Sequence, residues 1–539
     1  MRFFSMSFGS ARVRLVQTGV ALAAAVLVAG CGNTYRPVVT PINPTGPAAQ
    51  PTSYVVTVSA PPAVTSASSS NPLCPVANAG IATVIDYAGD SIMASACIGV
   101  GPTTFTIDGT GSNGYTINSD HTLTNFPLAV TGGGSLQPKN VNYTTLPTTA
   151  KPVNLSLQTA ALWAADLDGD VADTFTGFPQ TFQRSIPVAP TPVMVVGAGT
   201  GAARLFGISQ GFSNSTGLEC NATPTAVQLN GVADGIEVAS STVSAKIVLD
   251  PTNPTNDLAG TTNALCPVYA VSSSDGKRLF VLNRGSDTVS VINIQNDTLD
   301  QCVCPATGCV NQDNQTYTCH PILPVSPTAG LTHAGPVYAE YSAATNELVV
   351  ANYEGNSISV IDVSLDQFGN DSPTFGTTYT IPVGTNPASV TVLNDGSRAY
   401  TANQADQSVT IVNLTSHTVE KTLPVTGYPR TVVSTQNSSY GKVYVASPNS
   451  DYLTIIRTDK DIVDSTVLLQ GDVVDVRVTS QNAVSGNNNT VSRVPGYGQP
   501  CNLPDLPGGY QVVGASPGTT VEPSSSLADC QTQNPATLQ

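Results

Sequence analysis

Four acidic side chains alternate through one short segment, at Asp166, Asp168, Asp170 and Asp173. Carboxylates at this spacing can converge on one hard cation when the chain turns tightly, and calcium prefers such oxygen ligands. The segment departs from the EF-hand calcium loop, because Gly169 stands at the fourth place and no glutamate closes it. A turn between two strands explains the Asp-Gly pair as well. Calcium is therefore the one cofactor that the sequence suggests, with a simple hairpin turn as the alternative.

The N-terminus predicts export and lipidation. Residues 1–30 carry Arg2, Arg12 and Arg14 and no acid, followed by an apolar run that is too short to span a membrane, which is typical of a secretory signal peptide. The run ends in Val28-Ala29-Gly30-Cys31, which resembles the bacterial lipobox, in which the cysteine thiol accepts diacylglycerol. We expect Cys31 to anchor the chain to a membrane through this lipid, at the outer membrane, because Gly32 replaces the aspartate of an inner-membrane retention signal.

The other ten cysteines form an even set in a chain that we expect to meet an oxidising compartment, which favours disulfides. Neighbours in the sequence suggest three bridges and a cluster that would hold two more. Four thiols and the imidazole of His320 could instead ligate zinc, but an exported chain meets oxidant before metal. The suggested pairs are Cys74 with Cys97, Cys220 with Cys266 and Cys501 with Cys530, and the cluster is Cys302, Cys304, Cys309 and Cys319.

Two short motifs imitate enzyme sites. Gly207–Gly211 matches the nucleophile elbow around Ser209, and Gly197–Ala202 imitates a dinucleotide-binding loop. A nucleophile elbow and a dinucleotide-binding loop both need a helix after the motif. Strand-like sequence follows each motif instead, so we interpret both as parts of β-hairpins. The four histidines, His121, His320, His333 and His417, are scattered, and we interpret His417 as an exposed turn residue.

The composition limits the classes of function. Only 10% of the residues are charged, the formal net charge is -16, and the 20 cations form no basic patch, which excludes nucleic-acid binding. Residues 31–72 are rich in proline, serine and threonine and predict a flexible tether. Beyond Cys74, short runs of Val, Ile, Tyr and Thr alternate with turns of Asn, Asp, Gly and Ser, so we expect an all-β body.

The clearest unit of this body runs from Asn386 to Val425. It predicts four strands, at 389–393, 398–403, 408–413 and 418–423, and four antiparallel strands in about 40 residues is the size of a propeller blade. The segment Ala399-Tyr-Thr-Ala-Asn403, followed by Val-Thr-Ile-Val-Asn, resembles the YVTN family of bacterial β-propellers. The resemblance implies a β-propeller fold with this unit as its repeat.

Similar strand ends recur along the chain and set the predicted number of blades. They predict a seven-bladed β-propeller with four-stranded antiparallel blades over residues 73–478, followed by a loop-rich tail at 479–539. Six or eight blades are the alternatives. Either Tyr54–Val58 or Val473–Val478 would close the ring. The repeat positions are Ala96, Asp166, Ser209, Asn283, Asn352, Asn403 and Ser447.

These features favour a binding or scaffold module at the cell envelope, monomeric, with an envelope protein or a glycan as partner. The alternative is a metal-dependent lactonase-like or hydrolase-like propeller enzyme with a cation in its central channel. Such an enzyme needs acids that converge on the axis. We assign the acids nearest the clear repeats, Glu340, Glu347, Glu354 and Asp362, to strand edges or turns.

Overall fold

A computed structural model describes residues 54–61, 74, 76, 78–108, 111–128, 136–158, 161–197, 204–211, 230–253, 263–302, 309–435 and 441–479. All of its strands belong to one compact unit, 43–539. The one helix in these ranges is a 3₁₀ turn, η1 (Pro138–Asn140). Over the same residues no helix is long and apolar enough to cross a membrane.

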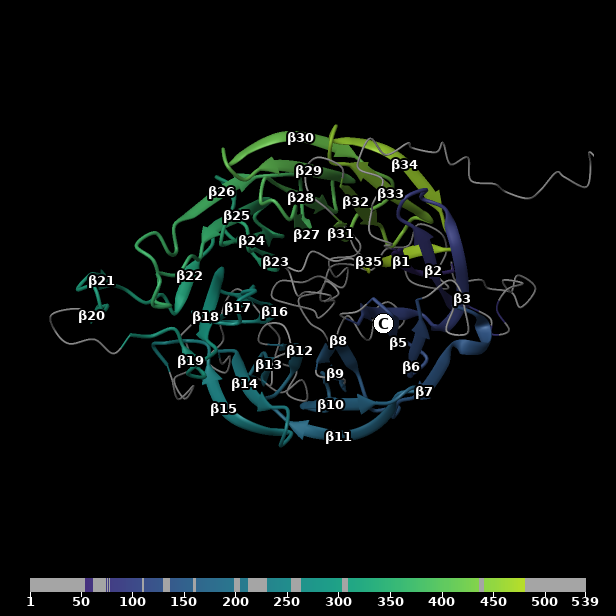
Figure 1. The fold of residues 1–539 in the computed structure, drawn as a ribbon, viewed down its shortest axis with the longest axis horizontal. Coiled ribbons are helices and arrows are strands. Elements are labelled where there is room, and N and C mark those ends of the chain that lie inside the picture. Colours follow the sequence, from purple (N-terminus) through teal and green to yellow (C-terminus); the bar gives the residue numbers. More distant parts are fainter. Residues whose placement is uncertain are drawn as a thin grey trace, which may run out of the picture. The chain divides into compact units, whose positions relative to one another are not determined.

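The strands form eight antiparallel sheets of the propeller type, which we number as blades 1 to 8 in chain order (Figure 1). In each blade an inner strand is followed outward by a second, a third and an outer strand. Blade 1 is β35, β1, β2 and β3, blade 2 is β4–β7, blade 3 is β8–β11, blade 4 is β12–β15, blade 5 is β16–β19 with β22, blade 6 is β23–β26, blade 7 is β27–β30 and blade 8 is β31–β34.

The first half of the ring has short strands. Their bounds are β1 (Tyr54–Ala60), β2 (Ala79–Asp86), β3 (Ile92–Val100), β4 (Pro102–Ile107), β5 (Asn113–Asn118), β6 (Thr122–Pro127), β7 (Asn142–Thr145), β8 (Pro152–Gln158), β9 (Ala161–Asp166), β10 (Val171–Thr176), β11 (Thr181–Pro187), β12 (Pro192–Gly197), β13 (Arg204–Ser209), β14 (Val232–Glu237) and β15 (Thr242–Val248).

The second half repeats this pattern with one interruption, in the outer strand of blade 5. The bounds are β16 (Pro267–Ser272), β17 (Arg278–Asn283), β18 (Thr288–Asn293), β19 (Thr298–Leu299), β20 (Cys309–Val310), β21 (Thr316–Tyr317), β22 (Ile322–Pro324), β23 (Pro336–Ser342), β24 (Glu347–Asn352), β25 (Ser357–Asp362), β26 (Thr378–Pro382), β27 (Pro387–Val392), β28 (Arg398–Asn403), β29 (Ser408–Asn413), β30 (Thr418–Pro424), β31 (Thr431–Ser434), β32 (Lys442–Ala446), β33 (Tyr452–Arg457), β34 (Ile462–Leu468) and β35 (Asp472–Val478).

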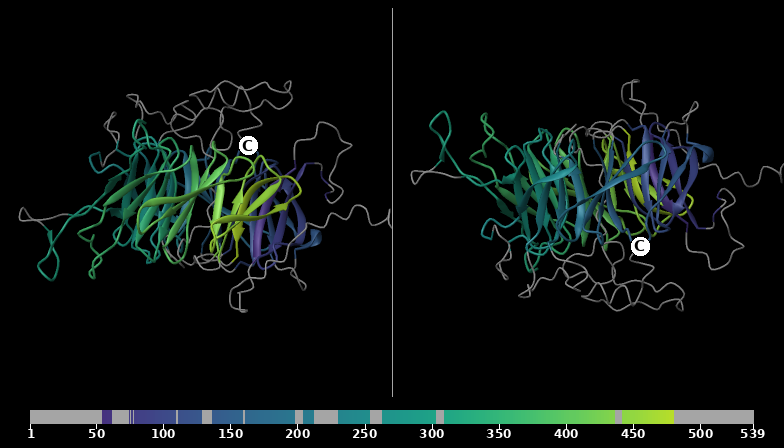
Figure 2. Two further views of the ribbon diagram at one scale, coloured as in Figure 1. Left: turned by 90° about the horizontal axis from the view of Figure 1, so that it is seen from above. Right: turned by 90° about the horizontal axis from the view of Figure 1, so that it is seen from below.

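The interruption lies between β19 and β22, which both pair with β18 and together take the place of one outer strand. The chain between them leaves the ring and forms the two-stranded sheet β20–β21. This pair projects beyond the blades in Figure 1, and it is the teal loop at the left of both views in Figure 2. We call residues 301–320 the blade 5 insertion.

Both ends of the propeller close the ring. The inner strands touch in a closed cycle, β35, β4, β8, β12, β16, β23, β27, β31 and back to β35. In blade 1, β35 supplies the inner strand and pairs antiparallel with β1, with Thr57 opposite Val476. The two segments that the sequence offers as alternatives for closure are therefore used together.

The prediction of seven blades is wrong, because the ring has eight. The missed one is blade 2, which lies within the long gap between Ala96 and Asp166. Its strands are rich in Thr and Asn, so their apolar alternation is weak, although β5 ends in the repeat-like Tyr115-Thr-Ile-Asn118. Ala96 itself lies in β3, an outer strand, and not at the end of a second strand.

The repeat asparagine has a clear structural role. In blade 5 the Nδ2 atom of Asn283, at the end of the second strand, donates to Thr288 Oγ1 at 3.2 Å and to Ser290 Oγ at 2.8 Å. Asn352 and Asn403 donate in the same way to hydroxyls five and seven residues further on. The asparagine thus fastens the second strand to the third within the blade.

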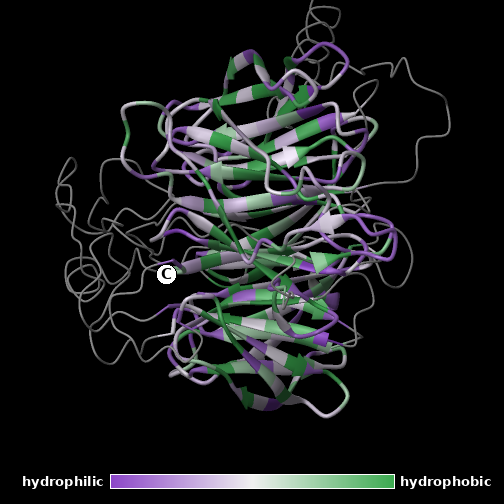
Figure 3. Ribbon diagram, turned by 90° about the vertical axis from the view of Figure 1, so that its left-hand side faces the viewer, coloured by the Kyte–Doolittle hydropathy of each residue, from purple (hydrophilic) through white to green (hydrophobic). Residues whose placement is uncertain are grey.

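Apolar side chains fill the space between neighbouring blades. Phe206, Phe280 and Val350, each on a second strand, are 0% exposed and belong to one cluster that spans blades 3 to 7. Burying one such side chain contributes roughly 1.5–3 kcal/mol. Hydrophobic and polar residues alternate along the strands in Figure 3, as sheets packed face to face require.

Candidate functional site

A repeated bulge shapes the inner strands. In blades 1 to 7 the pairing between inner and second strand shifts by one residue near the start of the inner strand. In blades 2 to 7 a proline begins the inner strand, which suits a site where the ladder is broken. We call the first residue after the shift the bulge position. It is Asp475, Thr104, Asn154, Met194, Tyr269, Tyr338 and Ser389 in blades 1 to 7.

In four blades this side chain bonds to the backbone of the next inner strand. Thr104 Oγ1 donates to the Val153 carbonyl at 3.4 Å, and Asn154 Oδ1 accepts from the Val195 amide at 2.9 Å. Met194 Sδ accepts from the Ala270 amide, and Ser389 Oγ donates to the Arg430 carbonyl at 2.7 Å. The bulge position therefore links neighbouring blades around the axis.

Blades 5 and 6 depart from this pattern. Their bulge positions are Tyr269 and Tyr338, whose rings lie 4.6 Å apart with an interplanar angle of 35°. Burial raises the pKa of Tyr338 to about 12 and also raises that of Tyr269 well above its usual value. The two hydroxyls lie close enough for each to affect the pKa of the other, raising that of Tyr269 and lowering that of Tyr338, although Tyr269 Oη has no partner at ideal hydrogen-bond geometry. Both side chains are almost completely buried.

Blade 1 departs from it as well. Asp475 occupies the bulge position, and Arg477 follows on the same face of β35. Arg477 Nη1 donates to Asp475 Oδ1 at 3.1 Å and to the Val476 carbonyl at 2.9 Å. Nη2 lies 3.1 Å from Asp475 Oδ2, close enough for an ion pair but without the alignment of a hydrogen bond. Nε, Nη2 and Oδ2 are buried without a hydrogen-bond partner.

β35 lies opposite β16 in the cycle of inner strands, and its charged side chains act electrostatically on the two tyrosines. The positive charge of Arg477 favours the ionised form of both Tyr269 and Tyr338, and thus lowers each pKa against the larger effect of burial. We call Tyr269, Tyr338, Asp475 and Arg477 the axial cluster.

Glu340 adjoins the axial cluster, two residues after Tyr338 on the inner strand of blade 6, and is 6% exposed. Burial raises its pKa to about 8, although hydrogen bonds from the Val392 amide and the Thr391 hydroxyl favour the ionised form. The interpretation of Glu340 as a strand-edge or turn residue is therefore wrong. It is a buried acid that is largely protonated at pH 7.

A second set of charges joins the blades farther out. In blades 4 to 8 the first residue of each second strand faces the turn between the third and outer strands of the next blade. Four turn residues, Asp90, Asp297, His417 and Asp461, have φ between 50 and 54°, a conformation that Asp and Asn tolerate best among residues with a side chain. We call these pairs the inter-blade belt: Arg204–Asp297, Arg278–Asp371, Glu347–His417, Arg398–Asp461 and Lys442–Asp90.

The sequence predicted that His417 is an exposed turn residue. It does lie in a turn, but it is half-buried. It stacks on Tyr379 with ring centroids 3.7 Å apart, and its Nε2 lies 3.9 Å from Glu347 Oε1. The pair reverses the usual polarity of the belt, since the acid is on the second strand and the base is in the turn.

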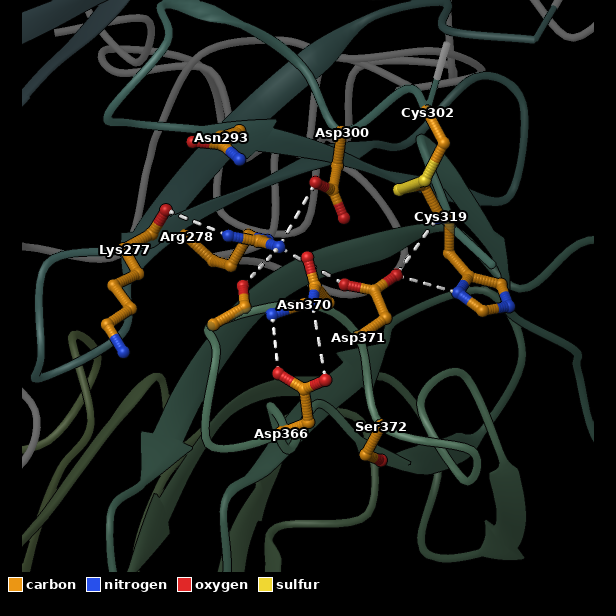
Figure 4. Close-up of polar contacts among 12 residues, drawn as sticks. Lys277, Arg278, Asn293, Asp300, Cys302, Cys319, Asp366, Asn370, Asp371 and Ser372 are labelled. Carbon is orange, nitrogen blue, oxygen red and sulfur yellow. Dashed lines mark hydrogen bonds and ion pairs between the residues drawn. A yellow bond between two sulfur atoms is a disulfide. The ribbon is translucent and has the colours of Figure 1, made fainter. Parts of the chain in front are cut away.

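Between blades 5 and 6 the belt carries a second acid (Figure 4). Arg278 Nη2 lies 3.2 Å from Asp300 Oδ1 and 3.3 Å from Asp371 Oδ1, and it also donates to the Gly369 carbonyl. All three charged side chains are buried. Burial raises the pKa of Asp300 to about 7; Arg278 lowers it and the nearby Asp371 raises it. Asp300 can therefore hold or release a proton near neutrality.

His320 completes this group, which we call the Arg278 cluster. Asp371 Oδ2 accepts from the His320 backbone amide at 3.0 Å and lies 2.8 Å from its Nδ1. The ring stacks on Phe375, with centroids 5.3 Å apart. The disulfide Cys302–Cys319 closes the blade 5 insertion beside Asp300 and His320, so it positions both around Asp371. The Arg278 cluster thus fastens the insertion to blade 6.

The acidic segment proposed for calcium forms the turn between β9 and β10. Asp166 Oδ1 accepts from the Lys151 and Gly169 amides, and Asp170 Oδ1 accepts from the Thr191 amide. Asp173 Oδ1 accepts from the Ser185 hydroxyl at 2.5 Å. Burial raises the pKa of Asp173. In the described ranges no group of three or more His, Cys, Asp or Glu side chains is placed to hold a metal ion.

The disulfide predictions are confirmed for the cysteines within the described residues. Cys74–Cys97 and Cys302–Cys319 are disulfides, so Cys302 and Cys319 are not zinc ligands. Cys266 and Cys309 are also disulfide-bonded. The cysteines that lie outside the described residues are Cys31, Cys220, Cys304, Cys501 and Cys530.

The two enzyme-like motifs lie in blade 4. Ser209 ends β13 and pairs with Val232 of the neighbouring strand, in a buried position. Gly197 ends β12, and the rest of its motif lies outside the described ranges.

The sequence reasoning missed the axial cluster. One signal could have found its tyrosines, since Pro-Val-Tyr-Ala occurs twice, at 267–270 and 336–339. Both copies begin an inner strand and place tyrosine at the bulge position. No comparable signal marks Asp475 and Arg477, because β35 joins β1 only in the folded ring.

The sequence matches no protein-family model and no curated protein. Among solved structures, it is similar to AztD from Citrobacter koseri at 12% identity, covering 79% of this chain and 98% of that one with a TM-score of 0.47. A putative 6-phosphogluconolactonase from Bacteroides fragilis gives 13% identity, 80% and 99% coverage and a TM-score of 0.45. Similarities this distant carry no information about activity.

Proposed function

We propose that this chain is a binding module of the cell envelope that takes a small ligand at its axial cluster. The observation that supports this most is the set of buried atoms that have no hydrogen-bond partner, Tyr269 Oη, Asp475 Oδ2 and Arg477 Nε and Nη2, of which Oδ2 and Nη2 are joined only as an ion pair. A buried polar group without a partner costs about 1–3 kcal/mol. A ligand that supplied partners would recover part of that cost. The equivalent side chains in blades 2, 3, 4 and 7 already bond to the next blade.

The acids near blade 6 favour binding over metal-dependent hydrolysis. Glu347 faces His417 at one blade interface, and Glu354 accepts from Arg284 Nε at 3.0 Å at another. Asp362 Oδ1 accepts from the Ser364 amide in a turn. Glu340 adjoins the axial cluster, and its raised pKa favours the neutral acid, which is a poor metal ligand. Asp475, the acid within the cluster, is paired with Arg477.

The envelope location is part of the proposal. The disulfides Cys74–Cys97 and Cys302–Cys319 support an oxidising compartment, which agrees with the predicted signal peptide. Lipidation of Cys31 would hold the propeller at the outer membrane through the 31–72 tether, where an envelope protein or glycan could contact its outer strands.

Recovery of the bound compound tests the function. The mature protein is equilibrated with an envelope extract, washed, denatured and examined by mass spectrometry for released small molecules. We expect a compound that the wild type retains, that Tyr269→Phe retains less, and that the control Tyr400→Phe retains fully. The control removes a hydroxyl that donates to Asp461 in the inter-blade belt. Recovery of no compound, or of a chemically converted one, would contradict a binding role.

Labelling with an alkyne fatty acid tests the anchor. The wild type should be labelled and should sediment with membranes, whereas Cys31→Ser should do neither, because only this thiol fits the lipoprotein pathway. Label that persists in Cys31→Ser would disprove the anchor and leave the binding role intact.

A further inference from the structure

We infer that the axial ligand is a small carboxylate with a hydrogen-bond donor beside its carboxyl group, as in a 2-hydroxy acid or an amino acid. This inference rests on the proposed function and names the ligand class of the same site. It follows from the chemical types of the unpartnered atoms and from their arrangement on β16 and β35.

The free edge of Arg477 selects the carboxylate. Its Nη1 is occupied by Asp475 Oδ1 and by the Val476 carbonyl, and Nη2 is ion-paired with Asp475 Oδ2 without hydrogen-bond alignment, so Nε and Nη2 both lack a hydrogen-bond partner. These two nitrogens point the same way along one side of the guanidinium plane. Two parallel donors match the two oxygens of a carboxylate, which gives both strength and orientation.

The acceptor beside this edge selects the second group of the ligand. Asp475 Oδ2 lies 3.1 Å from Arg477 Nη2 and has no hydrogen-bond partner. A carboxylate bound on the Arg477 edge would therefore stand next to a carboxylate oxygen of the protein, and the two would repel. A hydroxyl or ammonium group on the ligand removes this conflict, because it donates to Asp475 Oδ2.

The opposite side of the site is aromatic and largely uncharged. Tyr269, from β16 across the ring, contributes a hydroxyl that can donate to a carboxylate oxygen. Its ring packs against Tyr338, which offers an apolar wall. The charged and titratable groups that face the axial cluster are Glu340, Asp475 and Arg477 with the two tyrosines.

Glu340 gives the site a pH dependence. Below its pKa of about 8 the acid is neutral, and above it a negative charge appears beside the tyrosines. Repulsion should then weaken the binding of a carboxylate as the pH rises from 7 to 9. Glu340→Gln should abolish this loss, because glutamine stays neutral.

Isothermal titration of the mature protein with four molecules of similar shape tests the ligand class. Lactate and alanine carry both groups, propionate lacks the donor, and lactamide lacks the carboxylate. We expect lactate or alanine to bind at least tenfold more tightly than propionate and lactamide. Tyr269→Phe should weaken this binding by about 5- to 10-fold, as for the loss of one hydrogen bond, while Tyr400→Phe should leave it unchanged.

Asp475→Asn separates the two ligand types. Asparagine keeps an oxygen that can accept a hydrogen bond from a hydroxyl, but it loses the charge that attracts an ammonium group. The affinity for lactate should therefore fall less than the affinity for alanine. Melting curves check that each variant is folded. Equal binding of propionate or lactamide would overturn the inference. The inference would also be overturned if none of the four molecules bound although mass spectrometry recovered a retained compound. If mass spectrometry recovered no compound at all, the proposed function itself would be refuted.

Discussion

Lys442 donates its ammonium group to both carboxylate oxygens of Asp90, at 2.8 Å each, although 352 positions separate the two residues. Lys442 begins the second strand of blade 8, and Asp90 lies in the turn between β2 and β3 of blade 1. This pair of the inter-blade belt joins the last blade to the first.

Removing one partner of this pair should destabilise the ring. In Lys442→Met the buried Asp90 loses its counter-charge, which costs roughly 3–5 kcal/mol for a buried ion pair. The double variant Lys442→Met with Asp90→Asn should be clearly more stable than the single one, because no buried charge is left alone. Urea unfolding measures both. The control Lys277→Met removes a half-exposed lysine, 3.7 Å from Asp275, and should change stability by less than about 1 kcal/mol. Equal losses for Lys442→Met and this control would contradict the role of the belt.

Asp300 should make the protein less stable as the pH rises. Its pKa is about 7 in the folded state and 3.8 in the unfolded reference. Between these values the folded state holds the extra proton, so the free energy of unfolding falls with increasing pH, by at most about 1.4 kcal/mol per pH unit. Asp300→Asn should reduce this fall between pH 4 and pH 7, as measured by urea unfolding.

The matched control for Asp300 is Asp366→Asn. Burial alone would raise the pKa of Asp366, but hydrogen bonds from Asn370, Asn311 and Phe368 together outweigh it, so the pKa is lowered. Its stabilising contribution is complete above its unfolded pKa of 3.8, so the substitution should cost the same at pH 5 and pH 8. Because His320 Nδ1 lies 2.8 Å from Asp371 Oδ2 in the same cluster, the Asp300 comparison is repeated with His320→Gln. An unchanged pH profile in Asp300→Asn would refute the assignment.

Loss of the disulfide Cys302–Cys319 should loosen the blade 5 insertion and leave the other blades intact. The bridge closes a loop with a sequence separation of 17, and cross-links of this length contribute about 3 kcal/mol. Replacement of both cysteines by serine should speed amide hydrogen exchange at residues 309–320. Exchange in β27–β30 of blade 7 serves as the internal control. Faster exchange in both regions would show that the insertion supports the whole ring.

The acidic turn of blade 3 should respond little to calcium. Asp166 and Asp170 already accept backbone amides, and Asp173 accepts a hydroxyl. Thermal unfolding of the wild type with chelator, and then with millimolar calcium, should give nearly the same midpoint. Asp168→Asn with Asp170→Asn should be nearly silent. A calcium-dependent rise that this double variant abolishes would establish the metal site that the sequence suggests.

The sequence predicted the blade unit closely where hydrophobic alternation and turn residues agree. The expected strands at 398–403 and 408–413 coincide with β28 and β29. Blade 2 was missed because Thr and Asn replace the apolar residues that reveal a strand pattern. The count of blades failed for that local reason, while the propeller type did not depend on it.

The axial cluster could not be predicted in the same way. Tyr269 and Arg477 come together because β16 and β35 lie opposite one another in a ring of eight inner strands. With seven blades no two inner strands would stand opposite each other. The inter-blade belt was missed for a related reason, since Arg398 and Asp461 are ordinary strand-start and turn residues until neighbouring blades are packed together.

The pairing of β1 with β35 sets a constraint on how the chain acquires its structure. While the polypeptide is being synthesised or threaded through a membrane, β1, β2 and β3 emerge first and lack the strand that completes their sheet. Their sheet is completed only when β35 pairs with β1, and the paired residues lie more than 400 positions apart in the sequence. Contacts of such large sequence separation are associated with slow folding. Until Val478 is delivered, the edge of β1 remains open to pairing with other chains. Truncation shortly before β35 is therefore expected to yield an aggregation-prone product rather than a ring that lacks one strand.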